Sequence, residues 1–233
     1  MNRPHLLIVL LFVCYAATAF SQGKKVTRAE YEAALPKVMG VVPWRGKAHR
    51  EIRTTEVVDT GNPSLSYTQK EIVERDAARS AHHRVEAAGG KPEREWITIG
   101  DDMYLRRDGG KWELIPQSDS APPAPHAFRP FGLIALMPNL NPDGPRTKAD
   151  YRLGGPVECK KQTCFVYYRR VRQRNAANKI EQEQINEYWL LSNGEPLKVE
   201  QLNTKFTSGS KITRRVTSEW ELDPAVSILP PEM

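Results

Sequence analysis

The chain has 233 residues, with 34 Lys and Arg against 28 Asp and Glu and a formal net charge of +6. The basic residues alternate with Glu and Thr along strand-like stretches, which favours a solvated sheet face over a nucleic-acid interface, and we expect no nucleic-acid partner. The sequence lacks the motifs of serine hydrolases, zinc proteases and phosphate-binding loops, so we predict a non-enzymatic protein without catalytic residues, metal or cofactor. His82 and His83 are neighbours and would point to opposite faces of a strand, which prevents them from sharing one metal ion.

Residues 1–21 have the pattern of a signal peptide. Their sequence is "MNRPHLLIVLLFVCYAATAFS", with Arg3 at the start, an apolar run from Leu6 to Val13 and small residues after it. The apolar run is shorter than the roughly 20 residues of a membrane-spanning helix. We therefore predict cleavage near Ser21, with cleavage after Ala19 as the alternative, and a periplasmic or extracellular mature protein.

The mature chain opens with one amphipathic helix. In "TRAEYEAALPKVMG", Thr27 and Glu30 have capping-box spacing, and apolar residues follow at helical intervals. Pro36 is expected to shorten or bend this helix.

Strand patterns dominate the rest of the chain. In the first strand-like stretch, Arg53, Thr55 and Val57 fall on one side. Eleven stretches with strand character are separated by turn sequences: 50–59, 65–76, 80–87, 93–99, 103–107, 111–115, 148–153, 164–174, 181–191, 195–207 and 210–223. We predict a mainly β (α+β) fold, with one large curved antiparallel sheet or incomplete barrel and one or two helices on its concave face.

The middle of the chain interrupts this pattern. Residues 116–130 are rich in Pro and Ser and cannot pair in a sheet, and an apolar segment follows at 131–140. This segment is either a buried short helix or a mobile lid over an apolar cavity. The lid hypothesis names four residues: Phe131, Leu133, Ile134 and Leu136.

Cys159 and Cys164 are the only cysteines outside the predicted signal peptide. They enclose "KKQT", a four-residue loop of a length that β-hairpins use, so an exported chain would form a disulfide here. The alternative is a metal site, but two thiols without a nearby His supply only half of a tetrahedral zinc set.

The order of these elements resembles a known family. The signal peptide, N-terminal helix and charged strands, then "EWITIGDDMYLRRDGGKWELI" and "EYWLLSNGEPLKVEQLN", resemble the LolA and LppX-like periplasmic carriers of lipoproteins or lipids, including the related domain of the regulator RseB. The resemblance implies a single LolA-like domain over residues 22–233, an incomplete barrel whose concave apolar face is covered by helices and holds acyl chains.

Two functions follow as hypotheses. The first is a soluble exported carrier of a lipid or lipidated protein that works with an envelope membrane protein. The second is an envelope interaction or sensing module whose sheet is filled by its own helices. Residues expected to line the ligand cavity, or alternatively to form core packing, are Trp96, Ile97, Tyr104, Trp112 and Trp189.

Overall fold

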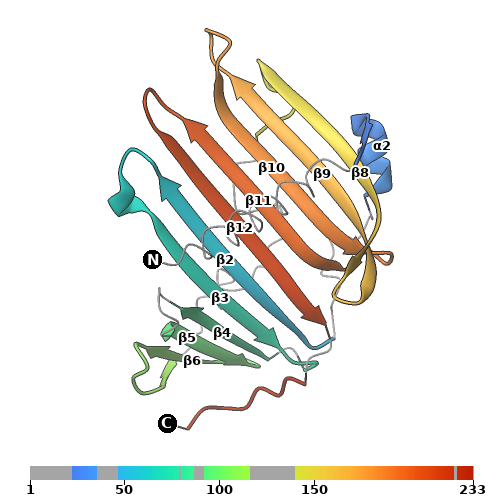
Figure 1. Ribbon diagram of the computed structural model, residues 1–233. Coiled ribbons are helices and arrows are strands. Elements are labelled where there is room, and N and C mark those ends of the chain that lie inside the picture. Colours follow the sequence, from blue (N-terminus) through green and yellow to red (C-terminus); the bar gives the residue numbers. More distant parts are fainter. Residues whose placement is uncertain are drawn as a thin grey trace, which may run out of the picture.

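The computed structural model of the protein describes residues 23–35, 47–78, 80–86, 92–115, 140–222 and 225–232. Within these ranges the chain forms one open antiparallel sheet of twelve strands and one α-helix, α2 (Arg28–Ala34) (Figure 1). The prediction of a mainly β fold with one large antiparallel sheet is therefore confirmed. The predicted signal peptide, the Pro-rich loop and the lid residues Phe131, Leu133, Ile134 and Leu136 lie outside the described residues.

The strands pair in the order β1-β8-β9-β10-β11-β12-β2-β3-β4-β5-β6-β7, and a short 3-10 turn, η2 (Pro63–Leu65), follows β2. Their bounds are β1 (Lys24–Val26), β2 (His49–Asp59), β3 (Tyr67–Arg75), β4 (Ala81–Glu86), β5 (Pro92–Ile99), β6 (Asp102–Arg107), β7 (Glu113–Ile115), β8 (Thr147–Cys159), β9 (Gln162–Arg174), β10 (Ile180–Leu191), β11 (Pro196–Phe206) and β12 (Lys211–Leu222).

Eleven of these strands overlap the eleven predicted stretches. The sequence did not predict β1, a three-residue edge strand that pairs with β8, with Val26 opposite Tyr151. Three residues are too few for an alternating pattern to appear, and two of them are Lys, which strands disfavour.

The helix begins at the predicted capping box and ends at Ala34, two residues before Pro36. The Thr27 hydroxyl accepts a hydrogen bond from the Glu30 backbone N–H at 3.2 Å, and the Glu30 carboxylate accepts one from the Thr27 N–H at 2.7 Å. Leu35 caps the C-terminus with extended backbone, the conformation favoured before a proline, here Pro36. No helix within the described ranges is long and apolar enough to cross a membrane.

The β8–β9 hairpin corrects one prediction. Its loop has two residues instead of four, because Lys160 and Lys161 both have positive φ (48° and 66°), as a two-residue type I′ turn requires. Cys159 and Cys164 form the predicted disulfide, with their Cα atoms 6.0 Å apart. They are diagonal neighbours on one face of the hairpin, since Cys164 pairs with Val157 and not with Cys159.

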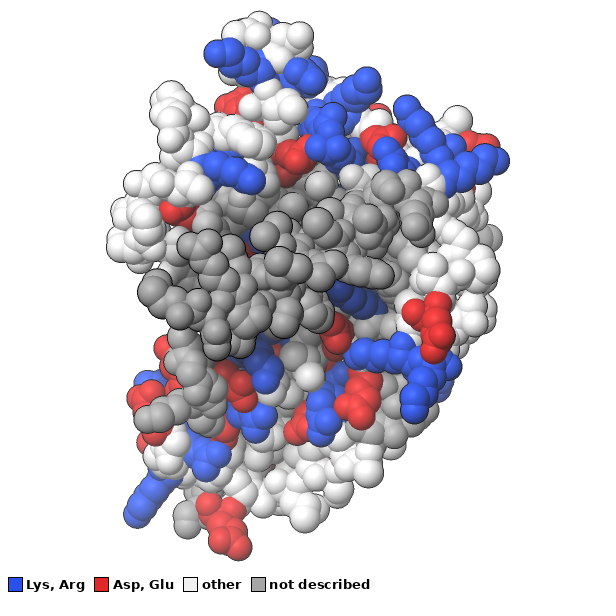
Figure 2. Space-filling model, in the orientation of Figure 1, with Lys and Arg blue, Asp and Glu red and all other residues white. Residues whose placement is uncertain are grey.

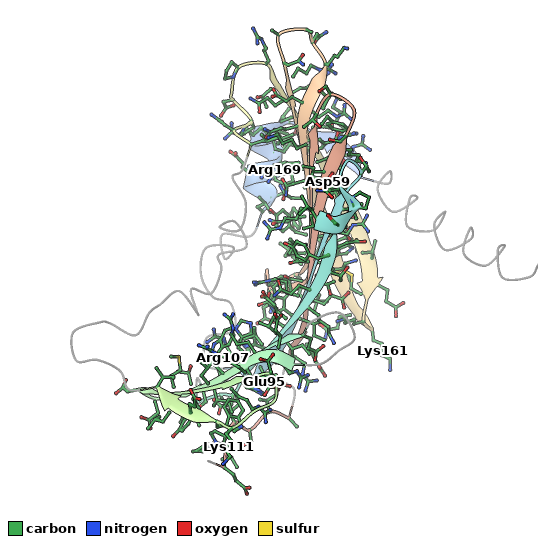
Figure 3. All side chains as sticks on the ribbon, turned by 90° about the vertical axis from the view of Figure 1, so that its left-hand side faces the viewer. Asp59, Glu95, Arg107, Lys111, Lys161 and Arg169 are labelled. Atoms are coloured by element: carbon green, nitrogen blue, oxygen red, sulfur yellow. A yellow bond between two sulfur atoms is a disulfide. The ribbon has the colours of Figure 1, made fainter. Side chains whose placement is uncertain are left out.

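The two faces of the sheet differ in shape. Figure 3 views the sheet along its edge and shows β5 and β6 bending toward the side on which α2 lies. We call the α2 side the concave face and the other side the convex face. Because paired residues on neighbouring strands share a face, the register assigns each side chain to one of them.

Candidate functional site

Tyr31 attaches α2 to the concave face. It is the one buried residue of the helix, with 3% of its surface exposed. Its ring centroid lies 5.1 Å from that of Tyr151 on β8 and 6.4 Å from that of Tyr167 on β9. Burial raises the pKa of the Tyr31 phenol, so the ring stays neutral. The helix is thus held by an aromatic cluster made of side chains from three elements.

An apolar core adjoins this aromatic cluster. Leu35 and Tyr167 pack against four buried side chains from β10, β11 and β12: Tyr188, Leu190, Val199 and Trp220. These residues come together because the register places Tyr188 between Tyr167 and Val199. This end of the concave face is therefore an aromatic and aliphatic core.

Buried amides lie next to the apolar core. Gln184 and Asn186 have no exposed surface, and Gln201 is 6% exposed. The Asn186 amide, oriented with its oxygen toward Arg169, accepts a hydrogen bond from the Arg169 guanidinium at 2.9 Å, and Gln201 is hydrogen-bonded to Tyr188. Figure 3 shows Arg169 on the α2 side of the sheet. Because burying an amide without a hydrogen-bonding partner is costly, these bonds fix the side chains of Asn186 and Gln201.

The other end of the concave face carries charges. Arg53 on β2 donates to Glu51 at 2.7 Å and, through longer contacts of 3.4 Å, to Glu71 on β3 and to the Ser218 hydroxyl on β12. Burial lowers the pKa of the nearby Arg75 guanidinium, and the charge of Glu51 opposes that shift. Two guanidiniums therefore balance two carboxylates, and we call these four residues the charged cluster.

His83 and Trp96 extend the charged cluster onto β4 and β5. Their rings are 3.7 Å apart between centroids. Burial, followed by the charge of Arg53, lowers the pKa of His83 to about 3. The imidazole is therefore neutral at physiological pH, and its 3.9 Å approach to Glu71 is a contact of a neutral ring with a carboxylate and not an ion pair.

The concave face is amphiphilic as a result. The apolar core and the charged cluster are neighbours across β12 and β2, where Trp220 pairs with Glu51. The buried amides of Gln184, Asn186 and Gln201 lie beside the apolar core along β10 and β11. In the part of the chain that the structure describes, His, Cys, Asp and Glu form no group of three that could hold a metal ion.

The predicted cavity residues are divided between the two faces. Trp96 lies on the concave face beside His83, whereas Ile97, Tyr104, Trp112 and Trp189 lie on the convex face. Trp112 packs there under the Arg106 guanidinium, 4.6 Å from its ring, and the Lys198 ammonium is 4.7 Å from the Trp189 ring. The five residues do not form one site.

Sequence reasoning missed the residues that do come together. The four tyrosines of the aromatic surface come from α2, β8, β9 and β10: Tyr31, Tyr151, Tyr167 and Tyr188. A signal for one of them was present, because in a strand only one residue of the "YY" pair at 167 and 168 can face the core. His82 and His83 lie on opposite faces, as expected, since His82 pairs with Ile97 and His83 with Trp96.

A hollow of about 230 Å³ is lined by Glu56, Val58, Thr213 and Arg215, near the ends of β2 and β12. Glu56 and Arg215 approach each other to 3.8 Å at its wall, so a charged pair forms part of the lining. By the register these residues lie on the convex face, away from the apolar core.

Two solved structures are similar to this chain. A LolA superfamily protein, NE2245 from Nitrosomonas europaea, aligns over 85% of this chain and 94% of its own, with 9% identity and a TM-score of 0.29. A putative outer membrane lipoprotein-sorting protein domain from Vibrio parahaemolyticus covers 85% of this chain and 92% of its own, with 12% identity and a TM-score of 0.24. The first of these proteins is named for the superfamily that the sequence resembles, but with TM-scores below 0.5 neither similarity assigns a ligand to this chain. No protein-family model and no curated protein matches the sequence.

Proposed function

We propose that this protein is an exported, non-enzymatic carrier that holds the acyl chains of a lipid or lipoprotein on the concave face of its sheet. The observation that carries the proposal is the amphiphilic concave face. Its apolar part is made of the partly buried Tyr167 and the buried Leu190, Val199 and Trp220, and its polar part is the charged cluster around Arg53. An amphiphile laid across the sheet would match both parts.

Both the acyl chain and the polar headgroup of such a ligand would be stabilised on this face. Burying apolar surface gains about 25 cal/mol per Å², so an acyl chain would be stabilised against the aromatic and aliphatic residues. A polar headgroup would keep hydrogen-bonding partners among the Arg and Glu side chains of the charged cluster. The predicted signal peptide and the Cys159–Cys164 disulfide fit an exported protein.

The experiment that tests the proposal is mass spectrometry of an organic extract from protein purified without detergent. Tyr167 and Tyr168 supply a matched pair, because they are adjacent on β9 but lie on opposite faces. We expect stoichiometric lipid on the native protein, loss of the lipid in Tyr167→Gln and retention of it in Tyr168→Gln. Equal lipid loss from two folded variants would contradict a site on the concave face.

The second candidate is an interaction or sensing module with a self-filled sheet. It is favoured by one observation: the Tyr31 ring already occupies the aromatic surface made by Tyr151 and Tyr167. A lipid-free extract from folded native protein would support this candidate over the carrier.

A further inference from the structure

Basic side chains gather on the convex face at the β1–β8–β9 edge of the sheet. The register places Lys25 beside Arg152, and Lys148 beside Arg172, with Arg170 next to Arg172 along the same face of β9. We call these five residues, Lys25, Lys148, Arg152, Arg170 and Arg172, the basic patch. Figure 2 shows Lys and Arg side chains gathered over the ends of β8, β9 and β10, whereas both signs of charge are mixed at the opposite end of the sheet.

Two carboxylates lie within the basic patch, and each is shared by two cations. Glu183 accepts from Arg170 at 2.7 Å and from Arg172 at 2.8 Å, through the same oxygen. Asp150 lies 3.2 Å from Arg152 and 3.9 Å from Lys25. Five cations against two carboxylates leave an excess of three positive charges on this part of the face.

The cations are the outer layer of the patch. The Glu183 side chain is 15% exposed, about half as much as those of Arg170 and Arg172, at 32% and 29%. Lys25 is 76% exposed, and Lys148 is also exposed. An approaching surface therefore meets ammonium and guanidinium groups before it meets a carboxylate.

On β2 and β3 the basic residues of the convex face contact acids. Arg50 contacts Glu74 and Glu221, and Lys70 contacts Glu86. The excess of positive charge in the basic patch is therefore not repeated on these two strands.

We propose that the basic patch docks the protein on anionic phospholipid headgroups. Guanidinium groups donate paired hydrogen bonds to phosphate oxygens, and basic residues near an anionic leaflet each add to membrane affinity. The five residues of β8 from Lys148 to Arg152 span about 13 Å, and three neighbouring strands span about 10 Å, so the patch is a broad array of the kind that contacts several headgroups. Protein interfaces instead depend on buried aromatic anchors, whereas Tyr168, the aromatic residue paired with Arg152, already has the Arg152 guanidinium 5.7 Å from its ring centroid.

This inference goes beyond the proposed carrier function, since it concerns the convex face and holds whatever the concave face binds. The test is cosedimentation of the full chain, purified after export, with vesicles of phosphatidylcholine containing phosphatidylglycerol or of phosphatidylcholine alone. We expect binding to the anionic vesicles only, and release at about 0.5 M NaCl, where charges are screened within a few Å.

The variant Lys25→Gln/Lys148→Gln removes the two exposed lysines of the patch and leaves the Arg170–Glu183–Arg172 contacts intact. We expect it to bind anionic vesicles about tenfold more weakly. The control Lys160→Gln/Lys161→Gln makes the same change of charge at the other end of β8 and β9, at two exposed turn residues, and should bind like the native protein.

Equal weakening in the patch variant and the turn variant would overturn the proposal, because binding would then follow net charge alone. Equal binding to both kinds of vesicle would also overturn it. Retention of the protein on polyglutamate without binding to anionic vesicles would overturn the membrane assignment and indicate an acidic protein partner. Lipid extraction tests the concave face separately, so failure of either proposal leaves the other measurable.

Discussion

At the scale of single residues, Glu187 on β10 is a buried carboxyl on the convex face. It is 3% exposed, and the register sets it opposite Glu200. Burial and then the charge of Glu200 raise the pKa of Glu187 from 4.5 to about 7, against a smaller opposing effect of Lys198. The folded protein therefore favours the protonated carboxyl.

The raised pKa gives the stability a pH dependence. Between pH 4.5 and about 7 the folded chain binds more protons than the unfolded chain, so this group lowers the free energy of unfolding as the pH rises through that window. Glu187→Gln should raise the free energy of unfolding by about 3 kcal/mol at pH 8 and leave it unchanged at pH 4. Urea unfolding at the two pH values measures this, with Glu181→Gln, an exposed residue of the same strand, as the control. An equal gain at both pH values would contradict the assignment.

At the scale of elements, α2 depends on Tyr31 for its position. A seven-residue helix is not stable alone in water, and its capping box adds only about 1 kcal/mol. The remaining stabilisation comes from tertiary contacts: burial of the Tyr31 ring among Tyr151 and Tyr167, packing of Leu35 against the apolar core, and the Arg28–Asp143 ion pair.

Tyr31→Ala should therefore detach the helix while the sheet stays folded. The backbone amides of residue 31 and Leu35 donate hydrogen bonds to the carbonyls of Thr27 and residue 31. We expect the free energy of local opening, measured by hydrogen exchange at these two amides, to fall by about 3 kcal/mol, or to zero if the helix is less stable than that. The neighbouring Glu32→Ala, at an exposed position, serves as the control. Loss of protection throughout β9 and β10 would show that Tyr31 supports the whole fold and not the helix alone.

The elements were predictable where local patterns determine them. Local signals were enough to predict α2 and eleven strands, because a capping box, a turn sequence or an alternating strand pattern is contained in a few adjacent residues. The β8–β9 turn was predicted with the wrong length, because Lys at both positive-φ positions is unusual in a turn that favours Asn and Gly.

At the scale of the whole molecule, the candidate site was less predictable than its strands. The contact between Arg53 and Ser218 joins residues 165 positions apart, and only the β12–β2 register brings them together. Trp96 and Ile97 were assigned to one cavity, yet adjacent strand residues must face opposite sides. The concave face is defined by sheet curvature and register, which composition and periodicity do not contain.

The basic patch has the same origin. Along β8 and β9 the sequence alternates basic, polar and acidic residues and predicts a solvated face. The register places Lys148 and Arg172 side by side, and Arg152 beside Lys25, so cations from three strands accumulate on one face.

The most direct test of the account is quenching of tryptophan fluorescence by a brominated fatty acid, which requires close contact. Trp96 and Trp220 lie on the concave face, and Trp112 and Trp189 lie on the convex face. We expect the fatty acid to quench the native protein, most of the quenching to be lost in Trp96→Phe/Trp220→Phe, and all of it to remain in Trp112→Phe/Trp189→Phe. Quenching that disappears with the convex pair, or no quenching of folded native protein, would contradict an acyl-binding site on the concave face.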